Sequence, residues 1–274
     1  MRTPGAPATT ILTRSRLKRA ATAGAAALVA CILVAPSVAQ PTGPQAGLQA
    51  GRQASARRIV RQAQAEPVVV ELFTAQGCPG CPEANRAIEA VSTEPGVLAL
   101  TYAVDYWDYL GWPDTFARPE FAQRQNAYRA ALRIRNVYTP QVVIDGARQM
   151  PGAASPALQQ AVTAAQADRA PPPQIEFRES GDRVGVGSGR VPRGGAEVWA
   201  VVYTPGAQTV AVSGGDNRGQ TVRHVNVVRR LTKLGAWNGR PALYPLPRRP
   251  GAGEAVAVLV QGREDRRILS AATL

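Results

Sequence analysis

A Cys-Pro-Gly-Cys segment between a strand-like run and a helix-like run constrains the possible folds of this chain more than any other feature. The apolar, β-branched run 68–73 predicts a buried strand, and the cysteines follow at positions 78 and 81. Residues 82–91 then predict a helix, with Pro82 in the first turn, where its missing N–H is tolerated. A helix N-terminus favours a thiolate, so this arrangement is typical of a cysteine pair that exchanges disulfides.

The spacing of the two cysteines favours catalysis over structural support. Cysteines that enclose two residues close a very small loop, which constrains the unfolded chain little and therefore stabilises a fold little. Within a catalytic pair, we expect Cys78 to be the more exposed sulfur and the attacking thiolate. Cys81 would then resolve the mixed disulfide formed at Cys78.

Proline limits the backbone donors around Cys78. Pro79 and Pro82 have no N–H, so Gly80 and Cys81 remain as the nearby donors to the Cys78 sulfur. Fewer donors stabilise a thiolate less. We therefore expect a moderately lowered thiol pKa, well above the value of about 3.5 found in the strongest oxidants.

The N-terminus has the pattern of an export signal. Basic residues precede an apolar stretch over 20–35, and residues 37–39 are the small side chains that a signal peptidase reads. We predict a signal peptide over residues 1–39, cleaved near Ala39, and a periplasmic or secreted mature protein. The apolar stretch is shorter than the roughly 20 residues of a membrane span, so we expect no stable span in the mature form. A lipoprotein anchored at Cys31 is the alternative.

The charge of the chain gives little support to nucleic-acid binding. The formal net charge is +13. Five of the 32 basic residues and none of the 19 acidic residues fall in the predicted leader, so the mature chain would carry 27 basic and 19 acidic residues, a net charge of +8. The arginines are scattered along the chain, and an exported protein seldom meets nucleic acid. We expect no nucleic-acid partner.

Composition divides the mature chain into a tail and two halves. Residues 40–65 are rich in Gln, Ala, Gly and Arg and predict a disordered tail. Residues 66–169 alternate strand and helix patterns, whereas residues 174–274 show only strand patterns, among them 198–203 and 221–230. For the second half we predict a small, mostly antiparallel domain of β-sandwich type.

The first half has the element order strand, C-x-x-C, helix, strand, helix, Thr-Pro, strand, strand, helix, which resembles that of a thioredoxin-like fold. The resemblance covers residues 66–169. It implies a cis peptide bond before Pro140, with this proline packed against the disulfide, and a buried acid at Glu71 that relays protons to Cys81. A solvent-facing acid is the alternative for Glu71. The predicted fold class is thus an α/β thioredoxin-like domain followed by a β-sandwich-type domain.

Three motifs connect the chain with one particular family. They are Val-Glu-Leu-Phe-Thr-Ala-Gln-Gly-Cys at 70–78, Val-Asp-Tyr-Trp-Asp-Tyr-Leu-Gly-Trp at 104–112 and Tyr-Thr-Pro-Gln-Val-Val-Ile-Asp-Gly at 138–146. They resemble the exported family known as domain of unknown function 1223, and residues 224–229 and 234–237 are similar to its C-terminal half. The resemblance spans nearly the whole mature chain. It implies a fold and a redox motif, and it leaves the substrate open.

Polar and aromatic residues around the motif are candidates for substrate contact. Asp105 and Trp107 follow a predicted strand and would lie at its C-terminal end, where open α/β sheets place their sites. The alternative, of equal weight, is that this aromatic run caps the core. For Gln76 and Gln141, a solvated position in a loop is the simpler interpretation. Three further candidates flank the expected site: Thr139, Gln76 and Gln141.

The sequence offers few metal ligands. The single histidine, His224, is distant from the motif along the chain, where a structural role is the more common one. A closed zinc site needs four ligands, and two cysteines with one histidine fall short of that number. We expect no metal and no bound cofactor.

These observations predict an exported thiol–disulfide oxidoreductase that acts on protein or small-molecule thiols and disulfides. Two alternatives stay open. One is a copper(I)-handling protein that binds the metal through its two thiolates. The other is a non-catalytic binding module with oxidised cysteines. The sequence leaves the direction of electron flow, the substrate and the oligomeric state undetermined.

Overall fold

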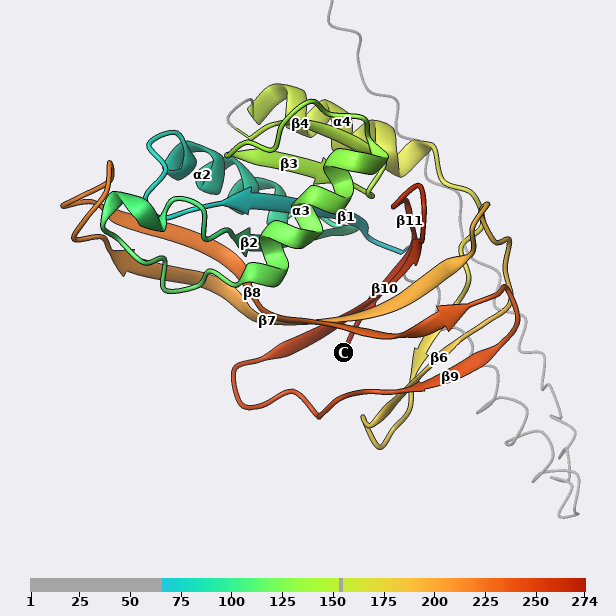
Figure 1. Ribbon diagram of the computed structural model, residues 1–274. Helices are drawn as coiled ribbons and strands as arrows, with labels where there is room; N and C mark the ends of the chain where they lie inside the picture. Colours follow the sequence, from blue (N-terminus) through green and yellow to red (C-terminus); the bar gives the residue numbers. More distant parts are fainter. Residues whose placement is uncertain (1–65, 153–154) are drawn as a thin grey trace, which may run out of the picture. The chain divides into compact units, whose positions relative to one another are not determined.

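One mixed sheet of eight strands forms the frame of the molecule (Figure 1). The computed structural model describes residues 66–152 and 155–274. The strands of this sheet are β1 (Val68–Thr74), β2 (Val97–Ala103), β3 (Gln141–Ile144), β4 (Arg148–Pro151), β7 (Ala196–Ala211), β8 (Thr221–Trp237), β10 (Ala255–Gly262) and β11 (Ile268–Thr273). They lie side by side in the order β11-β10-β7-β8-β2-β1-β3-β4.

A smaller sheet and a few helices accompany this frame. The small sheet, in the order β5-β6-β9, comprises β5 (Ile175–Phe177), β6 (Arg183–Val186) and β9 (Ala242–Pro245). The helices are α2 (Cys81–Ser92), α3 (Pro119–Ala131) and α4 (Ser155–Ala167), with one 3₁₀ turn, η1 (Asp108–Leu110). The predicted strand 68–73 and helix 82–91 thus agree with β1 and α2 to within one residue at each end.

The predictions about export concern residues that the structure does not describe. The signal peptide over 1–39, the alternative anchor at Cys31 and the tail over 40–65 lie outside the described residues and stay predictions. Between residues 66 and 274, apart from 153–154, no helix is long and apolar enough to cross a membrane.

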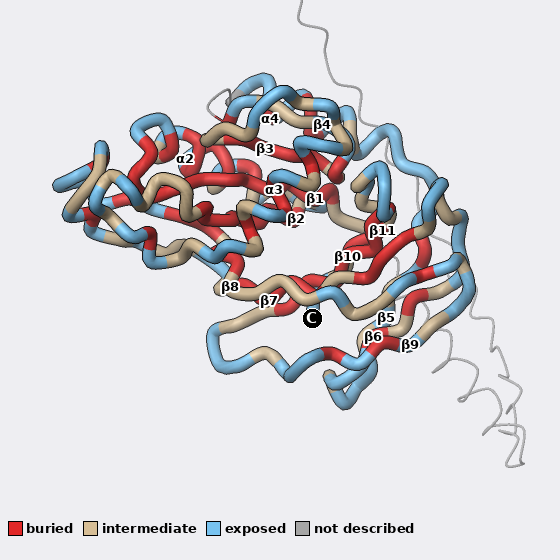
Figure 2. The backbone as a smooth tube through the Cα atoms, viewed as in Figure 1, coloured by how far each residue is buried: buried red, intermediate tan, exposed pale blue. Residues whose placement is uncertain are grey.

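The two faces of the interior strand β1 pack into two different hydrophobic cores. All seven of its residues are buried, and Figure 2 shows buried residues gathered along β1 and its neighbours. Val70 and Leu72 pack with α2 and α4 on one face. Val69 and Phe73 pack with α3 on the other. Because β1 pairs with parallel β2 and antiparallel β3, both of its edges are held, and its end delivers the cysteine segment to a fixed place.

The predicted fold class, a thioredoxin-like domain followed by a separate β-sandwich-type domain, is wrong. Strands from both halves of the chain form one sheet, in which β8 lies parallel to β2 at the pair Thr101 and Val227. The Thr101 hydroxyl also donates a hydrogen bond of 2.6 Å to the Val225 carbonyl. The physical reason is the edge of β2, which would stay unpaired if the first half folded alone.

The length of two strands makes this shared sheet possible. β7 has 16 residues and β8 has 17, far more than the usual five or six. The sequence predicts them as shorter strands over 198–203 and 221–230. In the first of these, Pro205 and Gly206 interrupt the apolar pattern. The hairpin passes these residues through an irregularity in the pairing between Thr204 and Ala207.

We therefore predict that the first half does not fold without the second. A fragment of residues 66–172 loses the β8 partner of β2, and the core under α3 loses Tyr203, Val228 and Leu259. We expect this fragment to show no cooperative thermal unfolding by circular dichroism, in contrast to the chain of residues 66–274. A sharp transition of the fragment would contradict the shared sheet as a requirement for folding.

Candidate functional site

Cys78 and Cys81 form a disulfide at the N-terminus of α2, with their Cα atoms 5.4 Å apart. β1 ends at Thr74, and the chain turns through the intervening residues into the helix. The Cys81 amide donates a hydrogen bond of 3.1 Å to the Cys78 carbonyl. Of the two backbone donors expected near the Cys78 sulfur, the Cys81 amide is therefore already engaged, and Gly80 remains.

Both cysteines are buried, so the expected difference in exposure between Cys78 and Cys81 is very small. The exposed fraction of Cys78 is 1%, and that of Cys81 is 0%. Pro79 and Gly80 between them are exposed, so the motif reaches the surface through its backbone and not through its sulfur atoms. Both cysteines belong to the core on the α3 face of the sheet. Burial occurs because segments distant in sequence cover the motif, which local patterns do not encode.

The structure places Pro140 beside the motif. Its peptide bond to Thr139 is cis. A Cβ atom added to Gly80 would lie 3.5 Å from Pro140 Cδ, so the proline ring contacts the turn between the two cysteines. Its carbonyl accepts a hydrogen bond of 3.0 Å from the Gly152 amide, which fixes the loop after β4 against it.

Trp107 and Thr139 bind each other. The Trp107 Nε1–H donates a hydrogen bond of 2.7 Å to Thr139 Oγ1, and the Trp107 ring packs against the core that holds the cysteines. At its other end, Trp107 Cβ lies 3.8 Å from the position of a Cβ added to Gly77. Trp107 therefore spans the motif from Gly77 to the Pro140 loop, and it caps the core. Asp105 is half-buried, and its backbone carbonyl accepts a hydrogen bond of 3.1 Å from the Asp108 amide.

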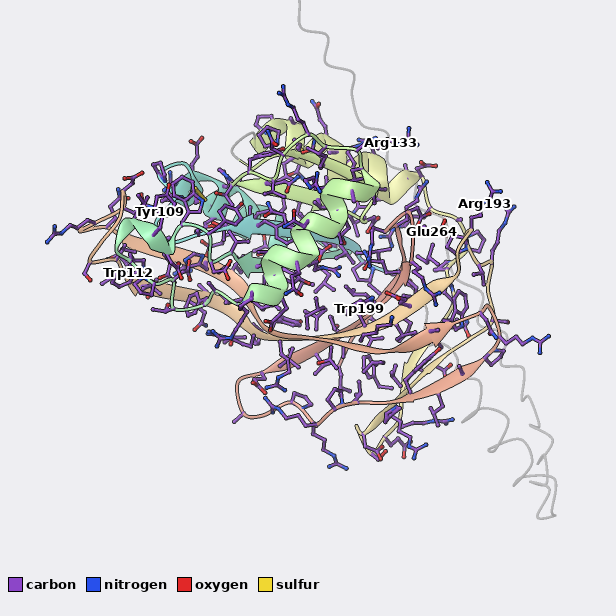
Figure 3. The ribbon with its side chains drawn as sticks, viewed as in Figure 1. Tyr109, Trp112, Arg133, Arg193, Trp199 and Glu264 are labelled. Carbon is purple, nitrogen blue, oxygen red and sulfur yellow. A yellow bond between two sulfur atoms is a disulfide. The ribbon has the colours of Figure 1, made fainter. Side chains whose placement is uncertain are left out.

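The exposed aromatic residue of this loop is Tyr109. Its exposed fraction is 79%, and it lies with Trp112 at the same end of the molecule (Figure 3). The sequence groups it with its aromatic neighbours, since spacing alone does not separate a capping ring from an exposed one. Tyr109 is the aromatic side chain of the run that remains available to a partner.

Gln76 and Gln141 are buried and engaged within the protein. Gln76 Nε2 donates to Thr115 Oγ1 at 2.8 Å, and its Oε1 accepts from Trp112 Nε1 at 2.8 Å. Gln141 Oε1 accepts a hydrogen bond of 2.9 Å from Gln125 Nε2. Gln76 thus fastens the loop of Trp112 and Thr115 to the motif, and Gln141 joins β3 to α3. Neither is the solvated loop residue that the simpler interpretation expects.

Glu71 is buried, as the resemblance implies, so the solvent-facing alternative is wrong. Its carboxylate pairs with Arg124 of α3, with Nε 2.7 Å from Oε1 and Nη2 3.2 Å from Oε2. The Tyr128 hydroxyl donates to the same carboxylate. Burial raises the pKa of Tyr128 well above its usual value, so this hydroxyl keeps its proton. Both carboxylate oxygens are thus engaged, and Glu71 holds α3 on the sheet. Its role as a proton relay to Cys81 stays a prediction.

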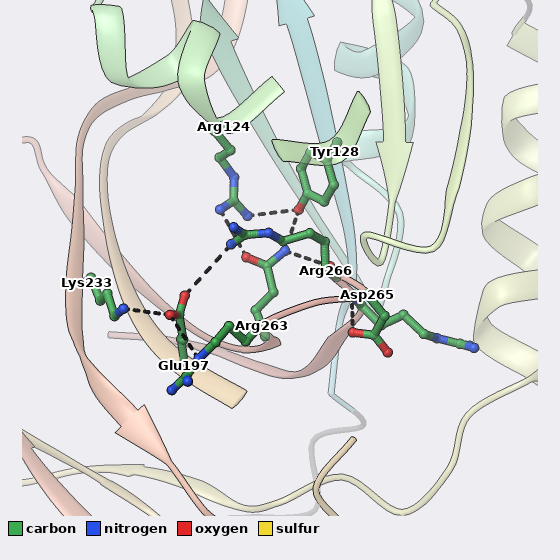
Figure 4. Close-up of polar contacts among 9 residues, drawn as sticks. Arg124, Tyr128, Glu197, Lys233, Arg263, Asp265 and Arg266 are labelled. Atoms are coloured by element: carbon green, nitrogen blue, oxygen red, sulfur yellow. Dashed lines mark hydrogen bonds and ion pairs between the residues drawn. The ribbon is translucent and has the colours of Figure 1, made fainter. Parts of the chain in front are cut away.

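The Glu71 pair continues into a wider polar cluster. Gln261 Nε2 donates to the Tyr128 hydroxyl at 2.8 Å, and Gln261 Oε1 accepts from Arg124 Nη1 at 3.2 Å. Figure 4 shows Arg124 and Tyr128 in this cluster, with Arg266 beside them and Glu197 farther along. β10 of the second half therefore helps to fix the arginine that neutralises Glu71 in the first half.

A second buried network, which the sequence does not reveal, lies behind α2. Thr74 Oγ1 donates to Asn85 Oδ1 at 2.9 Å, and Asn85 Nδ2 lies 3.2 Å from His224 Nδ1. Asn85 follows Cys81 by one helical turn. Burial, together with the nearby Arg229 charge, lowers the pKa of His224 to about 4, so the ring is neutral at physiological pH. His224 thus supports the helix that carries Cys81.

One residue from the second half binds the motif directly. Asn217, between β7 and β8, donates from Nδ2 to the Gln76 and Cys78 carbonyls, at 2.7 Å in each case. It lies 139 positions from Cys78 in sequence, and no local pattern identifies it.

Metal ligands do not converge in the described part of the chain. Within residues 66–152 and 155–274, no group of three or more His, Cys, Asp and Glu side chains is arranged to hold a metal ion.

Comparison with known proteins gives a family and a structural relative. A family model described as "Protein of unknown function (DUF1223)" matches residues 69–261. The crystal structure of protein AGR_C_4864 from Agrobacterium tumefaciens is 30% identical, has a TM-score of 0.63 and covers 77% of this chain and 94% of that chain. An endonuclease/exonuclease/phosphatase from Beutenbergia cavernae aligns at 18% identity over 37% of this chain and 22% of that chain, with a TM-score of 0.17 that carries no argument. No curated protein matches.

The Glu71–Arg124 pair yields a prediction about stability. Replacement of Glu71 by Gln leaves a buried guanidinium without its counter-charge, and we expect the free energy of unfolding to fall by about 3 kcal/mol or more. Glu89→Gln is the matched control, because its pair with Arg223 is largely exposed and screened by solvent. Urea unfolding measures both variants. Equal, small effects would show that Glu71 is not a structural ion pair.

His224 yields a prediction about pH. Its pKa is about 4 in the folded protein and near 6.5 when unfolded, so protons bind the unfolded chain more readily. The contribution of His224 is therefore fully present above about pH 6.5 and declines on acidification towards pH 4, by roughly 3 kcal/mol in total. We expect this decline to be absent from His224→Gln, measured by urea unfolding between these pH values. Since the chain has one histidine, the difference between the two proteins isolates it.

Proposed function

The chain belongs to the family described as protein of unknown function (DUF1223), and we propose that it is an exported thiol–disulfide oxidoreductase. The observation that carries the proposal is the Cys78–Cys81 disulfide at the start of α2, with Pro140 against its turn. A loop this small contributes little to stability, so a structural purpose explains it poorly. Disulfides persist in oxidising compartments, which is in keeping with the export signal in the sequence.

The proposed reaction exchanges one disulfide for another in two steps. When the protein oxidises its substrate, a substrate thiolate attacks the Cys78 sulfur, the bond between the cysteines breaks, and Cys81 leaves as a thiolate. A second substrate thiolate then attacks the substrate sulfur of the mixed disulfide and releases Cys78. Two electrons pass from substrate to protein. In the opposite direction, the Cys78 thiolate attacks a substrate disulfide, and Cys81 resolves the mixed disulfide.

The local electrostatics support Cys78 as the exchanging sulfur. It precedes a helix of 12 residues, whose N-terminal partial charge favours a thiolate there. Cys81 lies inside the first turn, so it is placed to attack the neighbouring sulfur and poorly placed to meet a substrate. One of the two expected backbone donors is occupied, which supports a thiol pKa that is only moderately lowered.

The burial of both sulfur atoms favours a second candidate, a binding module in which the disulfide stays oxidised. In that case Tyr109 would be part of a docking surface, because its ring is exposed at the same end of the molecule. Loss of either cysteine would then leave partner binding unchanged, whereas it would abolish exchange in the first candidate.

We predict that the two cysteines fail in different ways when replaced. Cys78→Ser removes the exchanging sulfur, so turnover of oxidised glutathione in the presence of a reductase system should fall to background. Cys81→Ser cannot resolve the mixed disulfide, and mass spectrometry should find glutathione attached to Cys78. Circular dichroism checks that both variants are folded. A Cys78→Ser protein as active as the parent would falsify the proposed function.

A further inference from the structure

The segment between β7 and β8 packs against the loop that carries Cys78. We call residues 212–220 the hairpin tip. Figure 1 shows it at the end of the sheet where β1 finishes and α2 begins. A Cβ atom added to Gly215 would lie 3.4 Å from Gly77 Cα, and one added to Gly214 would lie 2.6 Å from the Gly111 carbonyl oxygen. At Gly214 a side chain would clash with Gly111, whereas at Gly215 the positive φ of 67° favours glycine.

Asn217 is the polar attachment of the hairpin tip to the motif. Its exposed fraction is 1%, and its Nδ2 group donates to two backbone carbonyls, those of Gln76 and Cys78. Both carbonyls belong to the turn that leads from β1 to the disulfide. This amide group is therefore the attachment that the second half of the chain makes to the loop, which Asp114 also holds through the Gln76 amide.

The remaining neighbours of the motif are attached more firmly. Trp107 and Pro140 belong to loops of the first half, which pack on its core and bind each other through Thr139. The tip, by contrast, exposes most of its residues, and its own hydrogen bonds close within it, from Val212 to Gln220 and from Gly219 to Val212. Only Val212 and Asn217 of the tip are buried, and a segment with few buried side chains opens at low free energy, so we expect the tip to move before these loops.

We propose that Asn217 is a positioning residue of the cysteine pair, which keeps the Cys78 sulfur buried until the hairpin tip moves away. The inference rests on the proposed function and adds the control of access to it. With the tip in place, neither a small thiol nor a protein thiol reaches Cys78, so the opening of the tip governs the exchange rate for both. The second half of the chain thus controls the chemistry of the first.

The test measures access to the disulfide without catalytic turnover. Excess tris(2-carboxyethyl)phosphine reduces the oxidised protein, with water supplying the oxygen of the phosphine oxide and the protons of the two thiols. We expect Asn217→Ala to be reduced about tenfold faster than the parent or more, because the two hydrogen bonds to the Gln76 and Cys78 carbonyls no longer hold the tip. A rate equal to that of the parent would overturn the inference.

A nearly isosteric variant separates positioning from packing. Asn217→Asp keeps the shape but cannot donate when ionised, so at about pH 8 it should match the alanine variant. Burial raises the pKa of such a carboxyl, and a protonated Asp regains one donor. The rate relative to the parent should therefore fall back near pH 5. A ratio that is independent of pH would contradict a role for the donor.

Asn226→Asp is the matched control on the same hairpin. Asn226 Nδ2 donates to the Ala99 carbonyl at 3.0 Å, on β2 and away from the motif. This variant loses a comparable bond, and its reduction rate should equal that of the parent. If it is accelerated as much as Asn217→Asp, general destabilisation explains both and the inference fails. The proposed function is decided separately by glutathione turnover in Cys78→Ser, so each idea can fail while the other stands.

Discussion

The hairpin of β7 and β8 is the constraint on which the rest of the structure depends, because three of its parts contact the cysteine region. β8 pairs with β2 and closes the edge of the first half. His224 reaches the helix that carries Cys81 through Asn85. Asn217 holds the Cys78 carbonyl. Since one continuous element provides all three contacts, the edge, the helix and the cysteine loop are positioned together, and the site cannot be assembled from residues 66–169 alone.

Two buried polar groups show how the protein uses low-dielectric surroundings on either side of the sheet. Under α3, the two oxygens of Glu71 are occupied by Arg124 and Tyr128. His224 behind α2 stays neutral because burial opposes its charge. A buried ionisable group costs free energy unless it is paired or neutral, so both arrangements restrict how a helix lies on the sheet. Glu71 and His224 therefore help to position α3 and α2 on the sheet.

Local patterns predict the local part of this architecture and miss what depends on distant contacts. The strand at β1, the helix at α2 and the cysteine pair between them follow from apolar spacing and proline position. The separation into two domains fails because a propensity pattern does not say that β8 pairs with β2. The burial of both sulfur atoms is missed for the same reason, since Trp107 and Asn217, which contact the motif, are distant from it in sequence. Gln76 is predicted as a substrate contact, but its side chain is buried and bonded to Trp112 and Thr115. No sequence spacing connects these residues with Gln76, so the pattern does not reveal its burial.

A disulfide that is buried and also exchanges presents no contradiction if its cover is weakly held. Local openings in proteins range from almost no free energy to that of global unfolding, and segments with few buried side chains lie near the low end. Exposure in the closed form then says nothing about the rate of exchange, which depends on how often the tip is open. Closure also has a chemical consequence, because a covered disulfide resists random attack by abundant small thiols. If the protein exchanges disulfides as proposed, the bond from Asn217 to the Cys78 carbonyl gives the second half of the chain a part in that reaction.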